Sequence, residues 1–362
     1  MNIIKSQPPP MSPEEEEATR ILADARFHQT LTIPPSHCRD RSTPLSVAFA
    51  DIGDPNGTAL VSVGGLFGSR YTLALADELA RARGVRLLVP DKPGIGGTDG
   101  VGVEGKMGVW LEIITALASH LHLPHIAILG HSSGTIYALH TALHLRHLLH
   151  PQHPYIALAA PWVHPSDSGA FQASVAAALP DWAVRRWYDA TKAITRAGAS
   201  AMLGPSTARP GVELADKKTD PLTRAIDEKI LQYALEENVA GVSQEALFCL
   251  RGGPGAKGDD SGGGNIWGGW DDYDGFLRLL REREGAIDKE SARLAVDVYF
   301  AEQEKTSGNR GSEWFDECWK TYAADFIDYT SRTMPGTTHE TVMRPEKGVL
   351  DAIFQALSGR DK

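Results

Sequence analysis

The sequence predicts an α/β fold, with helices on both faces of a doubly wound, mostly parallel sheet. Short apolar runs alternate with helical patterns from residue 59 to residue 160, which is typical of buried parallel strands joined by helical crossovers. The alternation stops after Pro161 and resumes at Arg293. The 362 residues therefore predict one sheet that carries a long insertion, because a second domain would not interrupt the alternation and then let it continue.

Composition excludes several classes of protein. Asp and Glu (46) outnumber Lys and Arg (36), so the net charge of -10 disfavours nucleic acid or an anionic membrane surface as a partner. The three cysteines are scattered and form no CxxC pair, which disfavours a disulfide framework and a cysteine metal site. No secretion signal or membrane-spanning run is present in the sequence, so we expect a cytoplasmic protein.

The first part of the chain is expected to hold an arm and two strands. Residues 1–26 combine prolines with a glutamate run, which indicates a solvated arm or an accessory helix. Apolar residues at 28–33 and 46–50 indicate strands, and the Asp51–Gly57 segment has the turn residues that join antiparallel strands.

The remaining elements follow in order. The parallel strands are expected at 59–63, 85–89, 125–129 and 155–160, and the helices between them at 71–83, 106–122 and 133–147. The insertion has helical patterns at 171–179, 181–196 and 222–237 and a loop at 251–270 that holds nine glycines. Two further strands are expected at 293–300 and 325–333, with a last helix at 345–357. The predicted divisions are an arm at 1–26, a core at 27–163 and 285–362, and a helical cap at 164–284, between strands 6 and 7.

The strongest local motif is Gly130-His131-Ser132-Ser133-Gly134, which has the form G-x-S-x-G. It directly follows a predicted buried strand and directly precedes a helix, the context that the motif requires. Such a turn exposes the Ser132 hydroxyl in front of a helix N-terminus, and Gly130 and Gly134 let neighbouring backbone approach closely. We predict that Ser132 is a nucleophile.

A serine nucleophile needs a base, and the base needs an acid that holds it in place. Of the thirteen histidines, only His339 lies in the last half of the chain, on a loop after the last predicted strand. The loop after the strand at 293–300 offers two carboxylates, Glu302 and Glu304. Either could orient His339.

At this point the residues resemble the α/β-hydrolase fold superfamily, including uncharacterised fungal members with a cap. Members have the chain order Ser, acid, His, and often a small residue three positions before the acid; Ala301 therefore favours Glu304 over Glu302. Most relatives have Asp at this position. The resemblance implies a catalytic triad of Ser132, Glu304 and His339.

The resemblance extends to two segments after predicted strands. Gly64-Gly65-Leu66 stands where relatives carry a His-Gly turn, and Gly64 replaces the His. Because the oxyanion-hole donors are backbone groups, the resemblance implies the N–H groups of Leu66 and Ser133 as donors, with Gly64 and Gly65 as turn glycines. The segment Asp91–Asp99 matches the D-x-P-G-x-G-x-S/T segment of the family and is interpreted as a structural turn near the site.

Other candidate sites are weaker. The five histidines at 140, 144, 147, 150 and 153 have helical spacings that could place several on one face for a metal, but partly buried or solvated histidines are favoured there. The glycine pattern at 253–258 lacks the strand and helix of a nucleotide site. An aromatic group in the cap forms cap core or lines a pocket, whose possible lining residues are His131, Trp182, Trp187 and Tyr188.

The favoured function is hydrolysis of an ester, thioester or lactone through an acyl-enzyme on Ser132, with no metal and no cofactor. The expected partner is a small-molecule substrate with an apolar acyl group. Two alternatives stay open, because fold does not fix function: a carbon-carbon hydrolase, acyltransferase or cyclase, and a non-catalytic ligand-binding relative. The sequence does not predict the oligomeric state.

Overall fold

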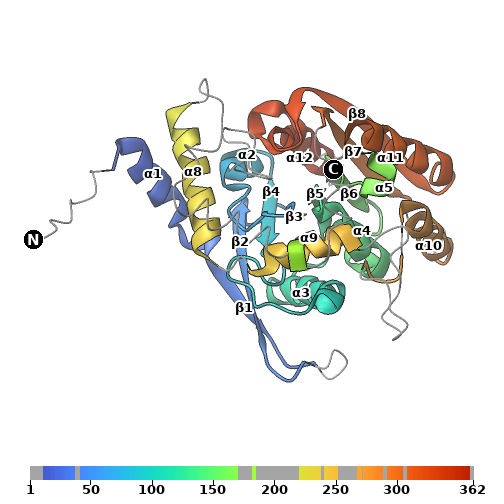
Figure 1. The fold of residues 1–362 in the computed structure, drawn as a ribbon, viewed down its shortest axis with the longest axis horizontal. Helices are drawn as coiled ribbons and strands as arrows, with labels where there is room; N and C mark the ends of the chain where they lie inside the picture. Colours follow the sequence, from blue (N-terminus) through green and yellow to red (C-terminus); the bar gives the residue numbers. More distant parts are fainter. Residues whose placement is uncertain are drawn as a thin grey trace, which may run out of the picture.

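A computed structural model describes residues 11–36, 41–169, 182–184, 220–237, 240–251, 267–270, 272–287, 292–304 and 308–358. These residues form an eight-stranded sheet in the order β1-β2-β4-β3-β5-β6-β7-β8 (Figure 1). The strands are β1 Gln29–Ile33, β2 Leu45–Gly53, β3 Thr58–Val63, β4 Val85–Pro90, β5 Ala127–His131, β6 Tyr155–Ala159, β7 Leu294–Gln303 and β8 Ile327–Thr338. From β4 onward in this order every pair is parallel, while β1 and β2 are antiparallel to their neighbours. The predicted α/β class with a mostly parallel sheet is confirmed.

Helices cover both faces of the sheet, as successive side chains of a buried strand point to opposite faces. One face packs against α3 Lys106–His120, α4 Gly134–His144, α10 Tyr273–Gly285 and α11 Gly308–Tyr322. The other face packs against α2 Asp77–Ala82 and α12 Val349–Ser358. The remaining α-helices of the described part are α1 Pro13–Leu22, α5 Pro165–Ser168, α8 Pro221–Glu236 and α9 Ala240–Arg251. Short 3-10 helices are Ala25–Phe27, Ala74–Ala76, Val103–Gly105, Arg146–Leu148, Thr341–Met343 and Pro345–Lys347.

Two local expectations are wrong. The turn within Asp51–Gly57 does not join an antiparallel pair, because β4 lies between the strands on either side of it. The turn passes over the start of β4 instead: the Asp54 N–H donates to Val85 O at 2.9 Å, and the Thr58 N–H donates to Gly84 O at 2.9 Å. The helix expected at 71–83 begins only at Asp77, whose carboxylate accepts from the Gly53 N–H at 2.7 Å.

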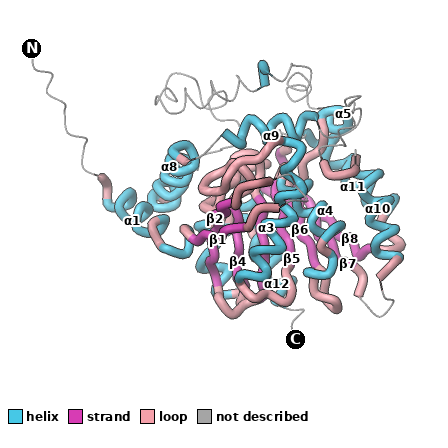
Figure 2. Tube along the Cα trace, turned by 90° about the horizontal axis from the view of Figure 1, so that it is seen from below, coloured by secondary structure: helices cyan, strands magenta, loops and turns pink. Residues whose placement is uncertain are grey.

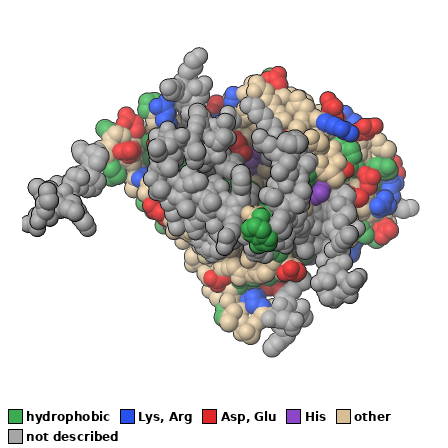
Figure 3. Space-filling view, in the orientation of Figure 1, with side chains coloured by type: hydrophobic (Ala, Val, Ile, Leu, Met, Phe, Trp, Pro, Cys, Tyr) green, Lys and Arg blue, Asp and Glu red, His purple; other side chains and the backbone are tan. Residues whose placement is uncertain are grey.

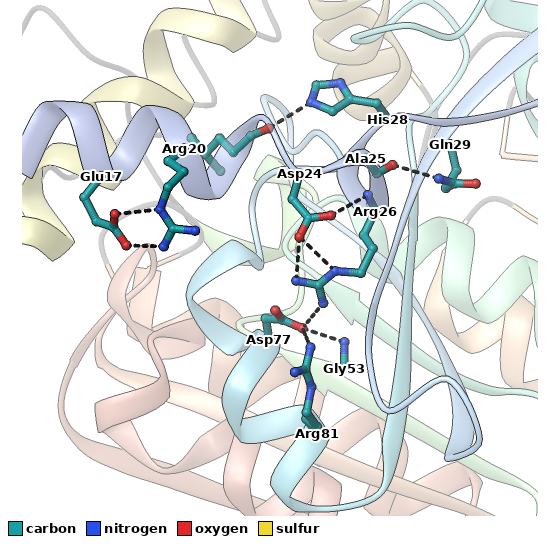
Figure 4. Close-up of polar contacts among 11 residues, drawn as sticks. Glu17, Arg20, Asp24, Ala25, Arg26, His28, Gln29, Gly53, Asp77 and Arg81 are labelled. Carbon is teal, nitrogen blue, oxygen red and sulfur yellow. Dashed lines mark hydrogen bonds and ion pairs between the residues drawn. The ribbon is translucent and has the colours of Figure 1, made fainter.

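The N-terminal helix α1 lies beside α8 of the insertion, and both views place the two helices together (Figures 1 and 2). Ala18 of α1 is fully buried and packs with Ala225 and Ile226 of α8. Below α1, Arg26 donates to Asp77 of α2 at 2.8 Å (Figure 4). The segment after α1 is thereby joined to the core, while α1 itself packs on the insertion.

The insertion is described in parts. Helix α9 packs into the larger core cluster, α10 contacts α4 and α11, and Arg344 near α12 donates to Asp227 of α8 at 2.6 Å. The helical patterns predicted at 171–179 and most of 181–196 lie outside the described residues. The domain boundaries at 26, 163 and 284 stay predictions.

The surface carries both signs of charge: acidic and basic side chains are interspersed over the described part of one face (Figure 3). Within the described ranges, none of the helices combines the length and the hydropathy needed to cross a membrane.

Candidate active site

Ser132 lies in a sharp turn between β5 and α4. Its φ of 54° is in the left-handed region, which is uncommon for a residue with a side chain and indicates backbone strain. Three hydrogen bonds over-determine this conformation: the Ser132 N–H donates to Ala159 O at 3.1 Å, and Ser132 O accepts from Thr135 N at 3.0 Å and Trp162 N at 3.2 Å. The turn therefore fixes the direction of the Ser132 side chain at the carboxyl end of the sheet.

The glycines on either side of Ser132 permit this turn. A Cβ on Gly134 would lie 2.1 Å from Val63 O, and one on Gly130 would lie 2.9 Å from the Ala138 Cβ. Both distances are too short for any other residue. The close packing of α4 on β3 and β5 thus depends on glycine at these two positions.

His339 connects Ser132 to Glu304. Its Nε2 lies 2.8 Å from the Ser132 Oγ, and its Nδ1 lies 2.8 Å and 3.0 Å from the two carboxylate oxygens of Glu304. Since a carboxylate only accepts, Nδ1 carries a proton, and Nε2 accepts from the Ser132 hydroxyl. All three residues are less than 9% exposed.

Strand order explains how residues so far apart in the sequence meet. Glu304 directly follows β7, and His339 directly follows β8, the parallel neighbour of β7. Parallel strands bring their carboxyl ends to the same edge of the sheet, where Ser132 follows β5. The other candidate acid, Glu302, is exposed and accepts from the Gly336 N–H at 2.9 Å instead, so the structure places Glu304 rather than Glu302 against His339.

The surroundings of His339 favour its protonated form. Burial by itself lowers the pKa of His339, but the hydrogen bond and the charge of Glu304 outweigh burial and raise the pKa above the ordinary value of 6.5. A base of this kind can accept a proton and keep it long enough to deliver it to a leaving group.

His131 stands on the other side of His339. Burial and the nearby His339 together lower the pKa of His131 to about 4, so the His131 ring is neutral at neutral pH. Its Nε2 lies 3.0 Å from the carbonyl oxygen of His339, so Nε2–H is the donor. The predicted pocket residue thus holds the main chain of His339.

The turn at Gly64–Gly68 lies against Ser132. A Cβ on Gly65 would come 3.0 Å from the Ser132 Cβ and 3.4 Å from its Oγ, and Gly64 packs against Gly68 at a similarly short distance. Within the described part of the chain, the backbone N–H groups of Leu66 and Ser133 donate no hydrogen bond. Both groups can therefore donate to a ligand oxygen.

Four buried polar residues behind this turn were not predicted from the sequence. Lys92, Lys106 and Tyr137 all contact Glu245 of α9, at 3.1, 2.7 and 2.6 Å. Lys92 belongs to the Asp91–Asp99 segment, where a lysine next to a buried strand was the one available signal. The charges of Lys106 and Lys92 hold the pKa of Glu245 to about 2, although its burial acts in the opposite direction.

The other predicted residues divide into those that the structure describes and those outside the described ranges. Trp182 is 66% exposed, and Trp187 and Tyr188 lie outside the described residues. Of the histidines at 140–153, the rings of His140 and His144 lie 4.3 Å apart, and those of His150 and His153 lie 5.2 Å apart. In the described part of the chain no group of three or more His, Cys, Asp or Glu is placed to hold a metal ion.

Comparison with known proteins gives no match in sequence: no protein-family profile matches the chain, and neither does any curated protein. Solved structures do match. A carboxylesterase from the thaumarchaeon Nitrososphaera gargenis is 15% identical with a TM-score of 0.58, over 92% of this chain and 100% of that one. A thermophilic esterase from Thermogutta terrifontis is 19% identical (TM-score 0.56, 92% and 100%), and a putative epoxide hydrolase from Klebsiella pneumoniae is 15% identical (TM-score 0.57, 93% and 98%).

Proposed function

Since the chain has the α/β-hydrolase fold, we propose that it is a serine hydrolase that cleaves a carboxylic ester, thioester or lactone. The observation that carries the proposal is the hydrogen-bonded series from Ser132 through His339 to Glu304. A serine at this turn favours acyl chemistry over epoxide opening, which relatives carry out with an Asp nucleophile. Fold similarity alone does not support one substrate over another.

In the first step, Ser132 Oγ bonds to the substrate carbonyl carbon while His339 Nε2 takes the hydroxyl proton. The carbonyl electron pair moves to the oxygen, where the N–H groups of Leu66 and Ser133 stabilise the negative charge. Glu304 stabilises the imidazolium that forms.

In the second step, the carbonyl re-forms, the bond to the leaving oxygen or sulfur breaks, and the proton on Nε2 passes to the leaving group. Water then takes the place of Ser132 as nucleophile and gives up a proton to His339. Collapse of the second intermediate releases the acid and returns the proton to Ser132 Oγ.

The substrate is proposed to be a small molecule with an apolar acyl group, acted on in the cytoplasm. The apolar acyl group is supported by the insertion predicted as a cap at 164–284, which holds four of the eight tryptophans of the chain. This insertion follows β6 in the chain, at the edge of the sheet where Ser132 lies. A pocket lined by His131, Trp182, Trp187 and Tyr188 belongs to the same proposal.

A fluorophosphonate probe tests the nucleophile. The wild type should be labelled once, Ser132→Ala should be unlabelled and inactive, and Ser133→Ala should be labelled like the wild type, because it keeps the backbone N–H. An unlabelled wild type contradicts the proposal.

Two further measurements test the reaction and the substrate. Hydrolysis in ¹⁸O-water must place one labelled oxygen in the acid product, whereas acyl transfer or cyclisation does not. A series of p-nitrophenyl esters of increasing chain length should show an optimum that gives the size of the acyl pocket.

A further inference from the structure

Lys92 is a buried lysine directly behind the turn that carries the Leu66 N–H. Its side chain is 1% exposed. Its ammonium lies 2.6 Å from Gly65 O, 3.2 Å from Gly64 O and 3.1 Å from the Glu245 carboxylate. An ammonium has three N–H donors, so each donor has one acceptor.

One of these acceptors belongs to the oxyanion donor itself. The carbonyl of Gly65 and the N–H of Leu66 are two ends of the same planar peptide group. A hydrogen bond to that carbonyl fixes the orientation of the plane, and hence the direction of the N–H. It also polarises the peptide, which strengthens the N–H as a donor in a site of low dielectric constant.

Glu245 connects this turn to the second donor. The fully buried carboxylate accepts from Lys92 and also from the hydroxyl of Tyr137, at 2.6 Å. Tyr137 belongs to α4, the helix that begins next to Ser133. A continuous series of hydrogen bonds thus joins the Gly65–Leu66 peptide to the helix that carries the Ser133 N–H.

We propose that Lys92, held by Glu245, is a positioning residue that aims the Leu66 N–H and sets its placement relative to the Ser133 N–H. The inference rests on the proposed function, because it concerns the oxyanion of an acyl transition state. The lysine touches neither the reacting atoms nor the triad, and it acts through the peptide that it binds.

Lys106 provides a matched control. It is equally buried and donates to the same Glu245 at 2.7 Å, but its other acceptor is Pro93 O, outside the Gly64–Gly65 turn. Lys92→Met and Lys106→Met each remove one buried cation from the same carboxylate. Only Lys92→Met removes hydrogen bonds from the Gly64–Gly65 turn, where the bond from the Gly68 N–H to Gly65 O at 2.9 Å remains in both variants.

The test measures p-nitrophenyl acetate hydrolysis and inhibition by 1,1,1-trifluoroheptan-2-one, which forms a tetrahedral adduct on a serine. Lys92→Met should lower kcat about 100-fold, the usual effect of losing one oxyanion donor, and leave KM nearly unchanged. The inhibition constant of the ketone should rise by a similar factor. Lys106→Met should keep both values within a few-fold of the wild type.

Equal losses in the two variants, or wild-type ketone affinity in Lys92→Met, would overturn the inference while leaving the proposed function intact. A wild type that is inert to both the ester and a fluorophosphonate overturns the proposed function itself, and the inference with it. If Lys92→Met does not fold, Tyr137→Phe tests the inference instead. This variant removes the hydrogen bond from α4 to Glu245 and keeps both lysines. It should lower kcat up to tenfold at constant KM, and an unchanged kcat overturns the inference.

Discussion

The His131 ring donates a hydrogen bond to the carbonyl oxygen of His339 at 3.0 Å. The two residues lie 208 positions apart along the chain, yet their ring centroids are 5.5 Å apart. The residue before the proposed nucleophile therefore holds the main chain of the proposed base.

His131→Phe should lower kcat for p-nitrophenyl acetate about tenfold, because one hydrogen bond of about 1 kcal/mol no longer fixes the loop of His339. KM should stay close to the wild-type value. The exposed His147 provides a control, since His147→Phe removes no contact to the site. A wild-type kcat in His131→Phe would contradict the positioning role.

The pH dependence of kcat/KM should report His339. A protonated imidazole cannot take the Ser132 proton, so activity falls as the pH drops through the pKa of His339, which Glu304 raises above 6.5 despite burial. Glu304→Gln should move the midpoint to lower pH and reduce kcat by about 10⁴. Glu302→Gln should leave the midpoint in place. A midpoint below 6.5 in the wild type is the contrary result.

Gly65→Ala should lower kcat at least tenfold with little change in the melting temperature. The new methyl group would lie 3.0 Å from the Ser132 Cβ, closer than ordinary contact, and would displace Ser132 or the turn. Gly285→Ala is the control, because nothing lies within 4 Å of its methyl group. Steady-state kinetics and thermal unfolding of Gly65→Ala and Gly285→Ala test this prediction. Equal kcat values in the two variants would refute the steric argument.

Asp91→Ala should reduce the free energy of unfolding by about 3–5 kcal/mol, as expected when one partner of a buried ion pair is removed. Asp91 is fully buried and accepts from the Arg70 N–H and guanidinium, both at 2.6 Å. Asp51→Ala removes a partly exposed pair with Arg86 and should cost only about 0–1 kcal/mol. Urea unfolding of both variants measures the difference.

Much of the fold could be predicted from the sequence because the buried parallel strands are short apolar runs between helical patterns. The strand expected at 85–89 is Val85–Pro90, and the one at 155–160 is Tyr155–Ala159. The antiparallel pair predicted from the turn at Asp54–Gly57 is wrong. Turn residues specify a local reversal of the chain, but they do not determine which strand pairs with which.

Some residues of the candidate site could likewise be predicted from the sequence, and others could not. Ser132 and His339 could be predicted from local context, since each directly follows a strand. Lys92 and Glu245 could not, because they are 153 residues apart and lysine and glutamate are surface residues in most proteins. Only the folded chain brings an insertion carboxylate into the space between two core lysines.

The contacts of the insertion bear on how the protein could be re-engineered. Its carboxylates Asp227, Glu237 and Glu245 all pair with cations of the core, and α8 packs on the N-terminal α1. If this insertion were grafted onto another protein of the same fold, Glu245 would lose its two lysine partners. If the insertion were replaced in this protein, the two lysines would lose their carboxylate. Exchange of this insertion with that of another protein of the same fold therefore has to move the insertion, the lysines and the N-terminal helix together.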